Sequence, residues 1–149
     1  MTVEFVRARS AERSPSGLIA FLGMEADVVE PGRVVFMFEA SERLANPFGT
    51  VHGGILATVL DSAMGMAALT SMPDEASAPT VALEVKYVRA VATDAGLLRA
   101  EGVVVHAGSR VVTTEGRIVG DDQRLYATAT AICLVDRAHL RSEPPSLDS

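Results

Sequence analysis

Hydrophobic and polar residues alternate at intervals of two along much of the chain, as in β-strands with one buried face. The first such stretch covers residues 22–38, where Pro31-Gly32 interrupts the alternation, so it predicts two strands joined by a turn. The inward face of this pair is expected to hold Leu22, Met24, Ala26, Val28, Val34, Phe36 and Phe38. Four later stretches predict strands at residues 80–91, 97–107, 110–119 and 125–135.

The gaps between the four later strands carry turn-forming residues. These are Asp94 and Gly96, then Gly108 and Ser109, then Gly120, Asp121 and Asp122, which favour hairpin turns. Within residues 80–91 the alternation places Thr80 on the face opposite to that of Val81, Leu83, Val85 and Tyr87. The four strands are therefore expected to form a meander.

One long helix is predicted over residues 53–72, ended by Pro73. Its apolar residues recur at spacings of three and four, at Ile55, Leu56, Val59, Ala63, Met66 and Ala67. Residues 41–51 lack a period and contain Asn46-Pro47, which predicts a surface loop. The elements together predict an α+β fold in which an antiparallel sheet wraps around one helix. Because such a sheet has edge strands that are commonly covered or paired, a homodimer is expected.

Composition supports a single globular domain. The chain has 149 residues, of which 48% are hydrophobic and 21% charged. We expect the domain at residues 18–138, a partly ordered segment at 1–17 and a disordered tail at 139–149. The net charge is −6 and the cationic residues are scattered, so nucleic acid is not an expected partner.

Residues 53–71 are long and apolar enough to raise the question of a membrane span. Asp61 lies near their centre, where a charge costs about 2.5 to 3.5 kcal/mol on insertion scales. The first residues of the chain also lack the apolar segment of a signal peptide. The sequence therefore predicts a cytoplasmic protein without a membrane partner.

Several familiar catalytic motifs are absent from the sequence. It contains no GxSxG elbow, no phosphate-binding GxxxxGK[ST] loop, no GxGxxG and no HExxH. The three histidines are far apart, and Cys133 lies in an alternating apolar strand as a small core residue would. Neither a metal nor a cofactor is expected.

The segment from Asn46 to Asp61 is the most informative in the chain. A helix that begins at Gly53 or Gly54 leaves its first N–H groups without intrahelical acceptors, and glycine lets another molecule approach that backbone. This predicts an anion or oxyanion site after His52, although a flexible helix start would use the same residues.

Asp61 is unusual because it lies in mid-helix with no cation three or four residues away. On a helical projection its neighbours are small: Gly54, Ala57, Thr58, Gly65 and Ala68. An acid that simply faces water would explain the position, but the Gly-Gly start upstream favours a ligand or a second backbone beside Asp61.

Asn46, His52-Gly53-Gly54, Asp61 and the segment Thr80-Val-Ala-Leu-Glu-Val-Lys-Tyr resemble the hotdog-fold acyl-CoA thioesterases of the phenylacetic-acid-degradation type. The resemblance covers roughly residues 18–135. It implies a hotdog fold, hydrolysis of acyl-CoA thioesters, and a homodimer with shared active sites, two of which commonly join as a tetramer.

The resemblance also implies roles for individual residues. Asp61 matches the general base or nucleophile, and the N–H of Gly53 matches the donor that polarises the thioester carbonyl. His52 and Asn46 match residues that shape this oxyanion site or hold water. Thr80 matches a position that orients the attacking water, although hydrogen bonding within its strand is an alternative.

Substrate contacts are expected next to these positions. Gly54 is one, and Ser109 with Arg110 lies at a predicted hairpin where family members often carry a basic residue that can meet a CoA phosphate. Arg89 is a second basic candidate. Both arginines would otherwise be ordinary solvated side chains.

Helix geometry indicates how the site is assembled. Gly53 and Asp61 are eight residues apart, about 12 Å along one helix, too far for both to contact one thioester group. We therefore expect each site to combine Asp61 and Thr80 of one subunit with the residues around Gly53 of the other.

Two other functions share the fold. One is a non-catalytic acyl-CoA or fatty-acyl binding module, and the other is a hotdog dehydratase. Asp61 together with Asn46 and His52 favours the hydrolase, because a sensor needs no carboxylate aimed at the carbonyl. The small face around Asp61 and the few aromatic residues are compatible with an aryl or a medium aliphatic acyl group.

Overall fold

The computed structural model describes residues 3–4 and 17–137. The predictions for residues 1–17 and 139–149 lie outside these residues, apart from positions 3, 4 and 17. The helices are α2 (Leu18–Phe21), the 3₁₀ turn η1 (Glu42–Leu44) and α3 (Gly53–Thr70). The strands are β1 (Glu25–Glu30), β2 (Arg33–Glu39), β3 (Thr80–Tyr87), β4 (Leu97–Ala107), β5 (Val111–Gly120) and β6 (Leu125–Leu134).

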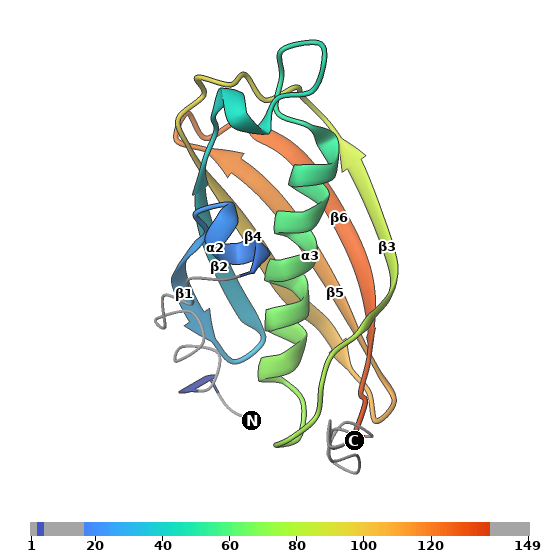
Figure 1. Cartoon of the computed structure of the whole chain (residues 1–149). Helices are drawn as coiled ribbons and strands as arrows, with labels where there is room; N and C mark the ends of the chain where they lie inside the picture. The colour runs from blue at the N-terminus through green and yellow to red at the C-terminus, as the bar shows by residue number, and fades with distance from the viewer. Residues whose placement is uncertain (1–2, 5–16, 138–149) are drawn as a thin grey trace, which may run out of the picture.

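The strands form one six-stranded antiparallel sheet in the order β1-β2-β4-β5-β6-β3, and α3 lies along one face of it (Figure 1). This confirms the predicted hotdog arrangement of a sheet around one long helix. The prediction of a four-strand meander was wrong, because only β4, β5 and β6 are neighbours in the sheet in the order of the chain. Strand β3 pairs with β6 at the sheet edge, and residues 88–96 carry the chain across to β4, which takes the place beside β2.

Helix α3 is the centre of the hydrophobic core. Its buried residues are Leu56, Val59, Leu60, Ala63, Met64, Ala67 and Ala68. The buried face of α3 is therefore rotated relative to the apolar face predicted from the sequence, since Ile55 and Met66 are only half-buried. The sheet wraps around the helix and buries a wider arc of it than the predicted apolar face. Ala68, which was expected beside Asp61, lies within this buried arc.

Close packing also explains the apolar character of α3. By length and composition alone this helix could cross a membrane. Here it packs so tightly on β4 that a side chain at Gly102 would overlap the backbone of α3 at Ala63. Its apolar residues therefore serve as the core of the sheet.

Two β-bulges change which residues face the helix. In β1 the register shifts between Ala26 and Val28, so Val29 is buried in place of the predicted Val28. In β3 the register shifts between Thr80 and Ala82. Thr80 therefore lies opposite the buried Cys133, on the same side as α3, which corrects the face predicted by simple alternation.

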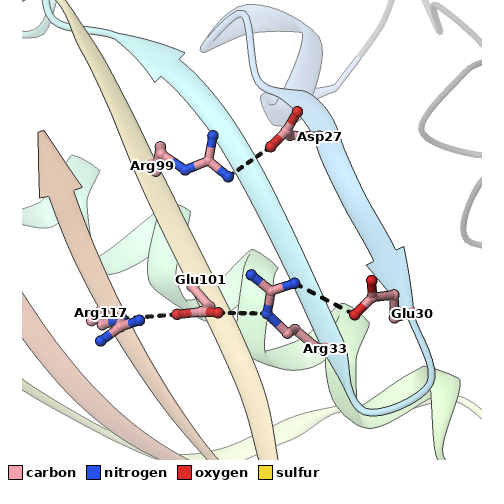
Figure 2. A network of polar contacts seen from close by, with 6 residues as sticks. All are labelled: Asp27, Glu30, Arg33, Arg99, Glu101 and Arg117. Carbon is pink, nitrogen blue, oxygen red and sulfur yellow. Dashed lines mark hydrogen bonds and ion pairs between the residues drawn. The ribbon is translucent and has the colours of Figure 1, made fainter. Parts of the chain in front are cut away.

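The sheet face away from α3 carries a network of ion pairs (Figure 2). Glu101 accepts hydrogen bonds from Arg33 Nε at 2.6 Å and from Arg117 Nε at 2.8 Å. Burial opposes the ionisation of Glu101, but these two hydrogen bonds and the charges of the two arginines together outweigh it and hold the pKa of its carboxyl below the ordinary value. Val35 on β2 is the register partner of Glu101 and is 1% exposed, so the ion pairs cover an apolar side chain on this face.

A hollow of about 550 Å³ adjoins this network and is lined by Glu84, Lys86, Glu101, Glu115, Arg117 and Thr130 among others. It lies on the face of the sheet opposite to α3, so it is separate from the residues singled out in the sequence. Strand β3, at the edge of the sheet, also carries exposed apolar residues: Val81 is 55%, Leu83 40% and Tyr87 53% exposed.

Candidate active site

Asp61 and Thr80 form one half of the candidate site. The Thr80 hydroxyl donates a hydrogen bond to Asp61 Oδ1 at 2.7 Å, between the middle of α3 and the first residue of β3. The bulge after Thr80 makes this contact possible, because without it the hydroxyl would face away from the helix. Asp61 Oδ2 has no hydrogen-bond partner among residues 3–4 and 17–137, so one carboxylate oxygen is held while the other is free.

Cys133 lies behind this pair. Its Sγ atom is 3.9 Å from Thr80 Oγ1, and the residue is fully buried. Burial raises the pKa of the Cys133 thiol, which therefore stays protonated at neutral pH. This agrees with the prediction of a small core residue.

Asn46 orders the loop that leads to the helix. Its Oδ1 accepts from the backbone N–H of Phe48 at 2.9 Å and of Thr50 at 3.2 Å, and its Nδ2 donates to Thr50 Oγ1 at 2.8 Å. Most of the amide's hydrogen-bonding capacity is thus used within the loop, so Asn46 shapes the approach to His52. Phe48, at the tip of this loop, is 91% exposed and was not singled out in the sequence.

His52 is the N-cap of α3. Its Nδ1 accepts a hydrogen bond from the N–H of Gly54 at 2.8 Å, so the neutral imidazole carries its proton on Nε2. The Gly53 N–H has no acceptor in the part of the chain that the structure describes. The two glycines therefore differ: Gly53 presents a free donor, whereas the N–H of Gly54 is occupied.

Tyr87, the last residue of β3, is a contact that the sequence did not predict. Its hydroxyl donates to the Gly53 carbonyl oxygen at 2.7 Å. A Cβ on Gly53 would lie 3.1 to 3.3 Å from the phenol group, so the ring packs directly on the glycine. In the sequence Tyr87 reads only as one more residue of the Leu83 and Val85 face.

The residues singled out in the sequence thus fall into two groups that one chain does not bring together. Asp61 is tied to Thr80 at one end of β3, and Gly53 is tied to Tyr87 at the other end. These ends are seven residues apart, about 23 Å along an extended strand. Along α3 the separation of Asp61 from Gly53 is about 12 Å.

The three residues considered for CoA binding are also dispersed. Arg89 follows β3 at the Gly53 end, and its backbone N–H donates a hydrogen bond to the carbonyl oxygen of Tyr126 at 3.1 Å. Ser109 and Arg110 are exposed in the β4–β5 hairpin, at the sheet end where Thr80 begins β3. Across residues 3–4 and 17–137 no group of three or more His, Cys, Asp or Glu side chains could hold a metal ion.

Chemically, the first group offers a carboxylate with one free oxygen, and the second offers a free N–H donor at the positive end of a helix. A carboxylate can activate water or attack a carbonyl, and an N–H donor can stabilise the oxyanion that results. Together the two groups would suit acyl transfer to water.

Comparison with known proteins points to the same class. A family model described as the thioesterase superfamily matches residues 48–127. The 1,4-dihydroxy-2-naphthoyl-CoA hydrolase of Listeria monocytogenes serotype 1/2a (strain 10403S) is 30% identical over 122 residues, which cover 81% of this chain and 97% of the relative.

Solved structures agree. A thioesterase family protein from Silicibacter pomeroyi is 30% identical with a TM-score of 0.77, over 87% of this chain and 93% of that one. A phenylacetic acid degradation-related protein from Ralstonia eutropha JMP134 is 30% identical with a TM-score of 0.72, over 83% of this chain and 95% of that one. Since the family model spans more than half of the sequence and relatives at 30% identity cover more than four fifths of it, the chain belongs to the thioesterase superfamily, with the hotdog fold.

Proposed function

We propose that the protein hydrolyses acyl-CoA thioesters to a free acid and CoA. Asp61 acts as general base or nucleophile, and the Gly53 N–H stabilises the developing oxyanion. Hydrolysis builds negative charge on the thioester oxygen, where one preorganised donor is worth about 10²- to 10³-fold in rate. The dipole of α3 adds to this stabilisation because Gly53 begins the helix.

One observation carries the proposal: the two groups are anchored at opposite ends of β3. Among the described residues no strand pairs with the outer edge of β3, which bears exposed apolar side chains. If β3 pairs in antiparallel fashion with β3 of a second copy, the Thr80 end of one strand lies beside the Tyr87 end of the other. Two composite sites result, each with Asp61 and Thr80 from one copy and Asn46, His52 and Gly53 from the other.

The same pairing would gather the basic candidates. Arg89 lies beyond the Tyr87 end of β3, and Arg110 lies beyond the Thr80 end. In the antiparallel dimer Arg89 of one copy therefore falls on the same side of a composite site as Arg110 of the other. Two cations there would suit the phosphates of CoA. A tetramer of two such dimers and a cytoplasmic location stay predictions from the sequence.

The relative from Listeria monocytogenes is named for a CoA thioester of a bicyclic aryl acid. That similarity makes aryl-CoA thioesters the first substrates to test, with medium-chain acyl-CoA thioesters as the alternative. The exposed Leu83 of β3, with the small residues of α3 beside Asp61, would receive the acyl group.

The test is thiol release from a panel of aryl- and alkyl-CoA thioesters by the purified protein. We expect turnover of at least one member and none by the Asp61→Asn variant beyond a residual rate. Saturable binding of the panel without any release of CoA would contradict hydrolysis and indicate an acyl-CoA binding module.

A further inference from the structure

We infer that Tyr87 is a positioning residue that aims the Gly53 N–H at the oxyanion, an inference that rests on the proposed function. Its hydroxyl donates to the Gly53 carbonyl oxygen at 2.7 Å, and its ring packs against the glycine Cα. Tyr87 comes from β3, so the strand that would form the dimer edge also holds the helix start.

A donor on glycine needs such support because glycine has the widest conformational freedom of all residues. Gly53 and Gly54 stand together at the first turn of α3, where no earlier helical turn restrains them. An oxyanion donor is effective only when its direction is fixed before the reaction. Something outside the helix must therefore fix the peptide planes on both sides of Gly53.

The contacts around Gly53 do this. The preceding peptide is held through its carbonyl, His52 O, which accepts from the N–H of Ile55 at 2.9 Å. The following peptide is held twice: its carbonyl accepts from Tyr87, and its N–H, that of Gly54, donates to His52 Nδ1 at 2.8 Å. With both planes fixed, the torsions at Gly53 and the direction of its N–H are fixed as well.

The Tyr87 hydroxyl contributes little to the fold as a whole. The residue is 53% exposed at the end of an edge strand, and the Gly53 carbonyl can keep its acceptor role within α3 when the hydroxyl is removed. Tyr87→Phe retains the ring that packs on Gly53 and deletes only the hydrogen bond. The variant therefore separates alignment of the donor from stability.

The experiment measures kcat and KM of Tyr87→Phe on the best thioester of the panel, with Val88→Ala as a neighbouring exposed control. Because loss of a whole oxyanion donor costs about 10²- to 10³-fold, we expect misalignment to lower kcat roughly tenfold. KM should stay within about twofold of wild type, and the thermal midpoint should match that of wild type. An unchanged kcat, or a higher KM alone, would overturn the inference.

A second measurement distinguishes positioning from direct contact with the substrate. In a Gly53→Pro background the N–H is absent, so adding Tyr87→Phe should change kcat no further. A tenfold loss that persists in that background would show that Tyr87 acts independently of Gly53 and would overturn the inference. If wild type is active and Tyr87→Phe equals it, only this inference fails; if wild type cleaves no thioester of the panel, the proposed function fails and the inference falls with it.

Discussion

Replacing Asp61 by Asn tests the reactive carboxylate with little change in shape. The asparagine Oδ1 can still accept the hydrogen bond that Thr80 donates at 2.7 Å, so the link between α3 and β3 should survive. The variant loses only the negative charge and the ability of the free oxygen to take a proton or attack a carbonyl.

The expected loss follows from that chemistry. A positioned general base contributes about 10²- to 10⁴-fold to the rate, which corresponds to roughly 2.7 to 5.5 kcal/mol in the activation barrier. We therefore expect kcat to fall at least ~100-fold, whereas KM changes little. The free energy of unfolding should not fall, since Asp61 is a half-buried mid-helix acid whose one hydrogen-bond partner among residues 3–4 and 17–137 is Thr80, and asparagine keeps that hydrogen bond.

The assay is thiol release under saturating thioester, with thermal unfolding of the same preparations. Thr80→Ser is the matched control, because serine retains the hydroxyl that meets Asp61 and should stay within a few-fold of wild type. Hydrolysis by Asp61→Asn within a few-fold of wild type would refute the assigned role of the carboxylate.

Three further substitutions test other parts of the account. Gly53→Pro should keep the fold, since proline suits the first position of a helix and its Cβ, 3.1 to 3.3 Å from the Tyr87 phenol group, requires that side chain to shift by a few tenths of an ångström. Turnover measured by thiol release should fall more than substrate affinity. Gly54→Ala is not a suitable control for this substitution, because its Cβ would lie 3.0 Å from His52 Nδ1. Gly102→Ala should lower the free energy of unfolding by about 3 kcal/mol in denaturant titration, as its side chain overlaps the backbone of α3, whereas Gly65→Ala, with nothing within 4 Å, should not lower it.

Glu101→Gln, which completes this set, should cost about 1 kcal/mol of unfolding free energy at pH 7. The pKa of Glu101 is lowered in the folded chain, so its stabilisation is present above the ordinary glutamate value and is lost as pH falls through the folded pKa. The difference between variant and wild type should therefore vanish in acid; an equal difference at pH 3 and pH 7 would contradict the ion-pair origin.

The periodicity of the sequence predicted the helix and most strand extents, because both patterns depend on local burial, but β3 ends at Tyr87 and not at the predicted residue 91. Helix α3 begins at the predicted Gly53, and β4 has the predicted limits. The position of β3 could not be predicted in this way, since pairing with β6 depends on how residues 88–96 cross the sheet and not on any residue of β3.

The candidate site was predictable only in part. Asp61 stood out as a mid-helix acid, but its contact with Thr80 depends on a bulge that alternation does not reveal. Tyr87 gave no signal, because a tyrosine at the end of an apolar strand reads as a core residue. The free N–H of Gly53 and the occupied N–H of Gly54 differ only because His52 caps the helix through its side chain.

The most direct test of the central claim is complementation between two inactive variants. Asp61→Asn and Gly53→Pro chains are mixed under conditions that allow subunit exchange, which is verified with differently tagged copies. Statistical pairing makes about half of the dimers mixed, and each mixed dimer has one site with both lesions and one site with none. The account predicts recovery to roughly a quarter of wild-type activity per subunit. No recovery despite verified exchange would contradict it and would mean that each site is built within one chain.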